Sequence, residues 1–402
     1  MARALVRLES GAELELDDGP LAPARSHLAR LGPAEPVRLV FAPGQLALRE
    51  SYRGAGHSAG HPGSAEEIAG HVDWSATRAL RTRLARLGLG IAEGLDAAQR
   101  RETGWAAAAR AIELTGRLAP RPAFLAGAST DHLREVRSTA ELVDAVVFQG
   151  RYIERHGGWP IVLPLGWLAE RGASEGEVLE VYRVIAAALA GPIFVHGARG
   201  GFPGRSLRRV LAGAPDKVRG ATLPRLEPAE ERELGRELLE REQLVLASDG
   251  APFARRLVSS ESDSAAQLAP PQRWTTLGGR RVALGAFQHA LLGVAGAAAE
   301  PIALALAYLA RGDGRRAAGL LVPCDALAEK LAEPPEESLP AGLAFLAWLA
   351  GHQPNRLLPN RADRSRPKEH LLELARLASR AGVLTDAAQA ALRLRAFLVG
   401  TS

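Results

Sequence analysis

The sequence predicts an α/β fold, a (β/α)8 TIM barrel with a short N-terminal extension and a C-terminal helical region. Three observations lead to this prediction. Apolar runs of strand length alternate with amphipathic segments of helix length, which is typical of parallel sheets. Eight such runs precede a purely helical region, and eight favour a closed barrel over an open sheet. No glycine-rich or Walker-type phosphate motif follows a strand, so nucleotide binding has no support.

The chain divides into three parts in sequence order. Residues 1–35 alternate weakly around a Ser-Gly turn and predict a hairpin and a short helix. Residues 36–296 form the barrel, and residues 297–402 form helices that cap it or join subunits. The helices expected in the barrel include one that Asp73 opens. The eight expected strands are Val37–Phe41, Leu89–Ala92, Ala123–Ala126, Ile161–Leu165, Pro192–Val195, Val218–Leu223, Leu244–Ala247 and Arg281–Leu284.

Composition indicates an ordinary globular protein of the cytoplasm. The chain has 402 residues, of which 47% are hydrophobic and 24% charged, enough to build a sizeable core. Its single cysteine, Cys324, excludes an intramolecular disulfide and fits a reducing compartment. The first ten residues contain no apolar signal segment. The most apolar stretch, 284–310, is interrupted by polar residues and a proline, so we expect no membrane partner.

The charged residues limit both the partners and the chemistry that we expect. The net charge is +5, but basic residues are scattered among acidic ones and form no stripe, so no nucleic-acid partner is predicted. Only three of the 50 basic residues are lysines, namely Lys217, Lys330 and Lys368. The chain therefore offers three side-chain amines as nucleophiles.

Several fragments resemble a known enzyme family. They read H-V-D-W-S-A-T-R-A-L-R, L-G-L-G-I-A-E-G-L-D-A-A-Q-R, L-A-G-A-S-T-D-H-L, G-P-I-F-V-H-G, K-V-R-G-A-T-L and A-F-L-A-W-L-A-G-H-Q, in this order from about residue 37 onwards. As a set they resemble a divergent branch of the dihydrodipicolinate synthase / N-acetylneuraminate lyase-like family. The resemblance implies a (β/α)8 barrel that forms a homo-oligomer. It also implies a 2-keto acid substrate, a Schiff base on a lysine of the sixth strand and a tyrosine ending the fifth.

The sequence departs from that family pattern at the positions that would carry the chemistry. The Schiff-base lysine aligns with Thr222, and the tyrosine aligns with His196. The threonine pair that ends the second strand falls near Glu93 and Gly94. Threonine cannot form an imine, and Lys217 is expected at the opposite end of the barrel. We therefore predict that the Schiff-base lysine is lost, with Thr222 at its position.

Polar residues are nevertheless expected where strands end, because barrel topology makes distant strand ends neighbours. We assign acid–base catalysis to Glu93, His196 and Asp249, since imidazole titrates near neutral pH and carboxylates can share that work. The alternative for each residue is a solvated loop position without a function. Asp96 and His132 lie at the same end. Substrate binding is assigned to the retained turn and to arginines that can hold a carboxylate, namely Gly127, Ser129, Thr130, Asp131, Arg199 and Arg225.

No cofactor is predicted, and one metal hypothesis stays open. Glu93, His196 and Asp249 could together bind a divalent ion, which would replace the iminium as the electron sink. His57 and His61 have the H-x-x-x-H spacing of a ligand pair on a helix. Their glycine-rich surroundings favour a loop instead, so the sequence gives the metal little support.

Two functions follow from these residues. The first is a lyase-like enzyme that acts on a small carbonyl or carbohydrate-like acid by acid–base chemistry. The second is a non-catalytic descendant that uses the barrel for ligand sensing or for assembly with a partner, as the joint loss of lysine and tyrosine would allow. The titratable groups at the strand ends favour the enzyme, whose ligand is a small molecule.

Overall fold

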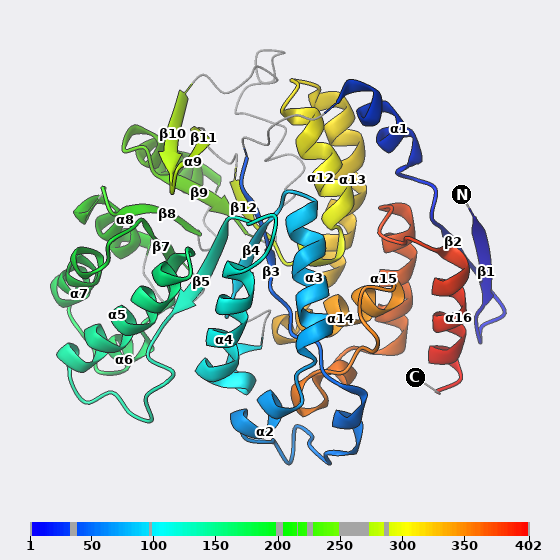
Figure 1. The fold of residues 1–402 in the computed structure, drawn as a ribbon, viewed down its shortest axis with the longest axis horizontal. Coiled ribbons are helices and arrows are strands. Elements are labelled where there is room, and N and C mark those ends of the chain that lie inside the picture. Colours follow the sequence, from blue (N-terminus) through cyan, green and yellow to red (C-terminus); the bar gives the residue numbers. More distant parts are fainter. Residues whose placement is uncertain are drawn as a thin grey trace.

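A computed structural model describes residues 2–32, 38–95, 99–197, 204–214, 216–222, 228–248, 273–284 and 289–400. Within these ranges eight parallel strands close into a barrel in the order β12-β3-β4-β5-β6-β7-β8-β9 (Figure 1). The predicted (β/α)8 fold is thereby confirmed. The barrel strands are β3 (Val40–Pro43), β4 (Gly90–Glu93), β5 (Phe124–Ala128), β6 (Trp159–Val162), β7 (Ile193–His196), β8 (Val218–Thr222), β9 (Leu244–Ala247) and β12 (His289–Leu291).

Helices connect the strands and cover the outside of the barrel. Local capping explains where several of them begin: Asp73 accepts hydrogen bonds from the backbone of Ser75 and Ala76, and Ser174 forms a capping box with Glu177. The helix that Asp73 was predicted to open is therefore confirmed. The helices are α2 (Ala65–Gly70), α3 (Trp74–Arg86), α4 (Arg100–Gly116), α5 (Thr139–Arg155), α6 (Gly166–Glu170), α7 (Glu175–Ala188), α8 (Gly204–Gly213) and α9 (Pro228–Glu240).

Side-chain alternation along the strands separates an inner core from an outer one. In β7, Phe194 belongs to the cluster that fills the barrel, whereas Ile193 and Val195 belong to the layer beneath the helices. All three are completely buried. The inner cluster is dominated by large side chains, including Phe41, Leu125, Trp159, Ile161, Leu244 and Leu246.

The predicted eighth strand is wrong. Arg281–Leu284 lies in β11 (Arg280–Leu284), which pairs antiparallel with β10 (Arg273–Leu277). Gly278 and Gly279 join the two strands with φ angles of +53° and +79°, as a two-residue hairpin turn with two left-handed positions requires. The barrel closes instead through the three-residue strand β12, which pairs with β3 and β9.

The β10–β11 hairpin covers the N-terminal end of the barrel. Its Leu277, Val282 and Leu284 join the inner hydrophobic cluster. A side chain at Gly278 would collide with Trp159, the first residue of β6. The hairpin therefore packs against the end at which the parallel strands begin, opposite the mouth.

The N-terminal extension packs against the C-terminal helices. It contains β1 (Arg3–Arg7), β2 (Glu13–Asp17) and α1 (Ala22–Leu31), as predicted. Arg395 donates a hydrogen bond to the carbonyl of Leu5, and Ser379 Oγ accepts one from the backbone N–H of Asp17. Figure 1 shows this hairpin beside α15 and α16. The C-terminal helices are α11 (Val294–Ala297), α12 (Ala299–Leu309), α13 (Gly314–Leu331), α14 (Leu339–Leu349), α15 (Lys368–Arg380) and α16 (Ala387–Leu398).

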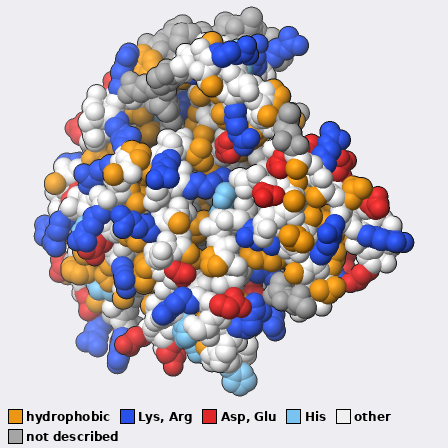
Figure 2. Space-filling model, turned by 45° about the vertical axis from the view of Figure 1, so that its right-hand side comes forward, with side chains coloured by type: hydrophobic (Ala, Val, Ile, Leu, Met, Phe, Trp, Pro, Cys, Tyr) orange, Lys and Arg blue, Asp and Glu red, His pale blue; other side chains and the backbone are white. Residues whose placement is uncertain are grey.

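Three 3-10 turns complete the described elements, namely η1 (Glu50–Gly54), η4 (Glu336–Ser338) and η5 (Pro359–Arg364). On the face that Figure 2 displays, Lys and Arg side chains are spread among Asp and Glu rather than gathered in one stripe. No helix in the described ranges combines the length and apolarity that a membrane crossing needs.

Candidate active site at the barrel mouth

His196 and Thr222 are neighbours at the C-terminal end of the barrel. They end the fifth and sixth barrel strands, β7 and β8, and they are register partners. His196 follows the inward-facing Phe194 by two residues, so it shares the interior face of β7. Thr222 follows Gly220, whose added Cβ would touch the ring of Phe194. Both side chains therefore belong to the uppermost layer of the barrel interior.

The backbone fixes the Thr222 hydroxyl. The N–H of Gly197 donates to Thr222 Oγ1 at 3.0 Å and to the Thr222 carbonyl at 3.1 Å. Thr222 is only 2% exposed, while His196 is half-buried. Because Oγ1 accepts from Gly197, its own proton points elsewhere and can be donated. The pair offers one imidazole for proton transfer and one oriented hydroxyl donor.

Sequence reasoning missed a third polar residue next to this layer, at the end of β9. Ser248 directly follows β9, and it is two residues beyond the inward-facing Leu246. Leu246 is also the register partner of Thr222. The period of two along β9 would have identified Ser248, whereas the sequence prediction chose the more acidic Asp249. Asp249 lies outside the described residues, as do Asp96, Arg199 and Arg225.

The position of Glu93 corrects the expectation of a catalytic carboxylate at the mouth. Its side chain is fully buried and forms a bidentate ion pair with Arg81 of α3, with Nε–Oε1 and Nη2–Oε2 distances of 2.7 Å. Thr115 of α4 donates to Oε1 at 2.6 Å. In β4 the inward residue is Ala92, so Glu93 faces the helices. Its carboxylate is committed to joining β4 with α3 and α4.

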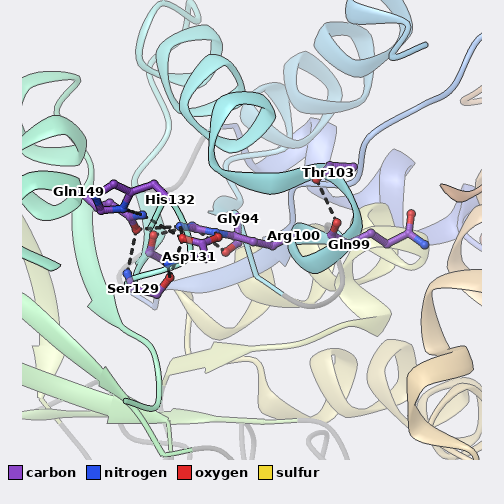
Figure 3. A network of polar contacts seen from close by, with 9 residues as sticks. Gly94, Gln99, Arg100, Thr103, Ser129, Asp131, His132 and Gln149 are labelled. Atoms are coloured by element: carbon purple, nitrogen blue, oxygen red, sulfur yellow. Dashed lines mark hydrogen bonds and ion pairs between the residues drawn. The ribbon is translucent and has the colours of Figure 1, made fainter. Parts of the chain in front are cut away.

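The predicted substrate-binding turn after β5 is built around an internal ion pair (Figure 3). Arg100, at the start of α4, donates to both carboxylate oxygens of Asp131 at 2.6 and 2.7 Å. Arg100 also donates to the carbonyls of Gly94 and Gly127. Close approach requires Gly127, because a Cβ there would lie 2.5 Å from the Gly94 oxygen, and Gly94 itself has a φ angle of +58°.

Gln149 of α5 completes this network. Its Oε1 accepts from Arg100 and from the backbone N–H of Ser129, and its Nε2 contacts Asp131 and His132 Nδ1. The Ser129 hydroxyl donates to Asp131 at 2.7 Å. The turn thus satisfies its own donors with a carboxylate from the chain. Thr130 is half-exposed, and its hydroxyl has no hydrogen bond within the described ranges.

The network explains two pKa shifts. Burial alone would raise the pKa of Asp131, but the hydrogen bonds and charge of Arg100 outweigh it and lower this pKa to about 2. Burial lowers the pKa of His132, and the Arg100 charge adds to this effect against the opposing charge of Asp131. A neutral His132 can accept the hydrogen bond from Gln149 at Nδ1.

The three lysines lie away from His196 and Thr222. Lys217 precedes β8 at the opposite end of the strand and donates to the carbonyls of Leu189 and Ala190. Lys330 of α13 pairs with Glu333, and Lys368 of α15 pairs with Glu9.

The histidines of the loop after β3 do not form a helical ligand pair. His61 pairs with Ser58 in a tight turn and is exposed, whereas the ring of His57 packs edge-on against Tyr52. Within the described ranges no three His, Cys, Asp or Glu side chains are grouped as a metal site. The proposed metal set of Glu93, His196 and Asp249 includes a residue outside those ranges.

Comparisons with known proteins agree with this architecture. A family model described as "Protein of unknown function (DUF993)" matches residues 37–202 and 206–401. No curated protein matches the sequence. Solved structures are similar in fold at low identity. Dihydrodipicolinate synthase from Agrobacterium tumefaciens is 15% identical with a TM-score of 0.55, over 86% of this chain and 98% of its own.

Two further structures give the same picture. Dihydrodipicolinate synthase from Oceanobacillus iheyensis is 13% identical with a TM-score of 0.54, over 84% of this chain and 94% of its own. Sialic acid aldolase from Ruminococcus gnavus is also 13% identical with a TM-score of 0.54, over 86% of this chain and 98% of its own. At such identities the similarity shows the fold alone.

Proposed function

The chain belongs to the DUF993 family, and on that premise we propose that its barrel is a lyase-like enzyme that uses acid–base chemistry without a Schiff base. The observation that carries the proposal is the pairing of His196 with Thr222 on the interior face at the ends of β7 and β8. Active sites of such barrels lie at this end. The substrate class is a small carbonyl or carbohydrate-like acid.

The two side chains have complementary roles in this proposal. His196 removes or returns a proton next to the substrate carbonyl, as an imidazole can near neutral pH. Thr222 donates its hydroxyl hydrogen to the carbonyl oxygen while negative charge develops there. Candidates for binding the acid group follow neighbouring strands. One is Ser248. The others, which lie outside the described ranges, are Asp249, Arg199 and Arg225.

The positions of the lysines support a mechanism without an imine. Lys217 holds the carbonyls of Leu189 and Ala190 before β8 begins, and the other two lysines form ion pairs on C-terminal helices. Thr222 stands on the sixth strand, where the related enzymes are expected to carry the Schiff-base lysine. If the chemistry uses a divalent metal, its ligands would be His196 and Asp249 without Glu93, whose carboxylate is paired with Arg81.

Proton exchange tests the proposal without requiring knowledge of a second substrate. Pyruvate or 2-oxobutanoate is incubated with the protein in D2O, and loss of the proton signal next to the carbonyl is followed by NMR. We expect the exchange to persist after borohydride treatment and to fall about a hundredfold in His196→Gln. Thr222→Val should also slow it. His156→Gln is the matched control, because His156 ends α5 just before β6 begins, at the opposite end of the barrel from the mouth.

One observation favours a second candidate, a barrel that binds a ligand without converting it. The expected carboxylate-binding turn is filled by the chain's own Asp131, and the Glu93 carboxylate is sealed in an ion pair. In that case pyruvate or 2-oxobutanoate would stabilise the protein on binding, yet the protons next to its carbonyl would not exchange. Equal exchange rates in His196→Gln and the wild type would contradict the enzyme proposal.

A further inference from the structure

The segment between α14 and α15 packs against the loop that follows β3. Asn355 donates a hydrogen bond to the carbonyl of Leu48 at 2.9 Å. The backbone N–H of Asn360 donates to the Tyr52 hydroxyl at 2.7 Å, and Asn360 Oδ1 accepts from the N–H of Gly63 at 2.9 Å. Because this loop leaves the C-terminal end of β3, the contact lies at the same end of the barrel as the mouth.

The backbone of this segment is held in an unfavourable conformation. Asn360 and Arg361 have φ angles of +53° and +61° in succession, in the left-handed region that non-glycine residues seldom occupy. The contacts of Asn360 with Tyr52 and Gly63 keep the first residue there. Such strain persists only where surrounding contacts hold it, and it is concentrated at ligand-binding and active sites. Here the side chain placed is that of Arg361.

Two nearly buried arginines share one carboxylate in this segment. Arg361 donates to Oδ1 and Oδ2 of Asp363 at 3.1 and 3.0 Å. Arg356 donates to the backbone carbonyl of Asp363 at 2.8 Å, and its Nη1 is 4.0 Å from Oδ2. The Asp363 side chain is 2% exposed, whereas those of Arg356 and Arg361 are 16% and 13% exposed. One buried negative charge therefore faces two positive ones.

Arg356 is the less satisfied of the two. Its guanidinium lies over the ring of Phe397, 5.0 Å from the ring centroid. Its Nε is buried and has no hydrogen-bond acceptor in the described part of the chain. Burial lowers the pKa of Arg356, and the charges of Arg361, Arg53 and Arg364 lower it further against Asp363. Geometry brings the other two arginines to the same place: Arg53 follows Tyr52, whose hydroxyl accepts the hydrogen bond from Asn360, and Arg364 follows Asp363 in η5.

The cluster carries more positive charge than its carboxylates can balance. Arg53 pairs with Glu50 at 2.7 Å, so in the described part of the chain Glu50 and Asp363 are the carboxylates that form ion pairs with these four arginines. The surplus is two positive charges, the charge of a phosphate dianion. Buried charges normally have a partner, because leaving one unpaired costs free energy. Planar guanidinium groups are also well matched to phosphate oxygens.

We propose that Arg53, Arg356, Arg361 and Arg364 bind a phosphate group, either inorganic phosphate or a small phosphate ester. Arg53 and Arg364 are exposed and would contact the phosphate from the solvent side. Arg356, Asp363 and Arg361 are more deeply buried and would lie beneath it. This site is formed by η1 and the segment before α15, not by His196 or Thr222. It goes beyond the proposed lyase chemistry.

Calorimetric titration with inorganic phosphate tests the site directly. Phosphate is added at constant ionic strength, with sodium chloride and sodium acetate as comparison salts and glycerol 3-phosphate as the ester. We expect saturable phosphate binding and a matching rise in melting temperature. Acetate should bind at least tenfold more weakly, because it carries one charge. Tighter binding of the ester than of phosphate would identify an organic ligand, and the reverse order would identify the free ion.

Variants locate the binding. Arg356→Met keeps the stacking on Phe397 and removes the charge, and we expect it to weaken phosphate binding at least tenfold. Arg86→Met, which changes an exposed arginine of α3, should bind phosphate like the wild type. Equal binding in Arg356→Met and the wild type would overturn the proposal. If Arg356→Met does not fold, Arg364→Met provides the same test from the exposed side, and absence of saturable binding to the wild type rejects the site without any variant.

Discussion

Two arginine–carboxylate groups of this protein differ in how completely their charges are paired. In the first, Arg81 and Glu93 are matched one to one, 1% and 0% exposed, and Arg81 also donates to the carbonyls of Gly44, Gln45 and Thr77. In the second, Asp363 serves both Arg361 and Arg356, and Arg356 Nε has no acceptor in the described ranges. A group whose charges are all paired within the protein has a structural role. A group with a positive charge left unpaired can bind an anionic ligand.

The largest expected effect is at the complete group. Glu93→Gln leaves the buried Arg81 charge without its partner, and we expect a loss of about 3–5 kcal/mol in the free energy of unfolding. Urea unfolding followed by circular dichroism measures this loss. In the Arg81→Met/Glu93→Gln double variant, the loss should be smaller than the sum of the single losses, since no unpaired charge remains. Additive losses would mean that the pair is not coupled.

The pair of Arg100 with Asp131 lies between these cases, because the Asp131 side chain is 31% exposed. We expect Asp131→Asn to cost about 1 kcal/mol near neutral pH, since a partly exposed ion pair contributes modestly. The folded pKa of Asp131, about 2, is below its ordinary value of 3.8. The contribution of the carboxylate is therefore complete above pH 3.8 and disappears as the pH falls towards 2.

The measurement is the difference in unfolding free energy between the wild type and Asp131→Asn, taken from pH 6 down to pH 2.5. The difference should narrow below pH 4. A difference that stays constant over this range would show that the Asp131 carboxylate is not stabilised by Arg100.

The smallest effect is expected at the incomplete group. Without phosphate, Arg356→Met should change the free energy of unfolding by no more than about 1 kcal/mol, because it removes surplus charge while keeping apolar contact. Urea unfolding in chloride buffer provides the measurement. If Arg356→Met lowered the free energy of unfolding as much as Glu93→Gln does, both groups would have a structural role and the comparison would fail.

Strand identity could be predicted from the sequence where a strand is an uninterrupted apolar run. Leu244–Ala247 was predicted to the residue, and β7 and β8 were predicted to within one residue, which placed Thr222 and His196 at the strand ends. The eighth strand failed because β11 has the same apolar signature as a barrel strand. Its partner is the neighbouring β10, and only tertiary pairing distinguishes a covering hairpin from a barrel strand.

The candidate active site was harder to predict from the sequence, because it depends on which way each side chain at a strand end points. Glu93 lies at the end of a barrel strand, as predicted, but a one-residue difference in phase turns it towards α3. Nothing in the local sequence of Glu93 reveals Arg81, which lies 12 residues earlier on a helix. The Arg356–Asp363–Arg361 group was missed because its residues stand in a segment that reads as a charged linker.

The hairpin of the first residues has a consequence for how the chain is made. Leu5 is hydrogen-bonded to Arg395, and the backbone of Asp17 to Ser379, so the hairpin finds its partner only after α15 and α16 have been synthesised, more than 360 residues later. A two-stranded hairpin is marginal by itself in water, and contacts between distant residues form slowly. Until α15 and α16 are made, the apolar face of the hairpin has no partner, so we expect its packing to be a late step of folding.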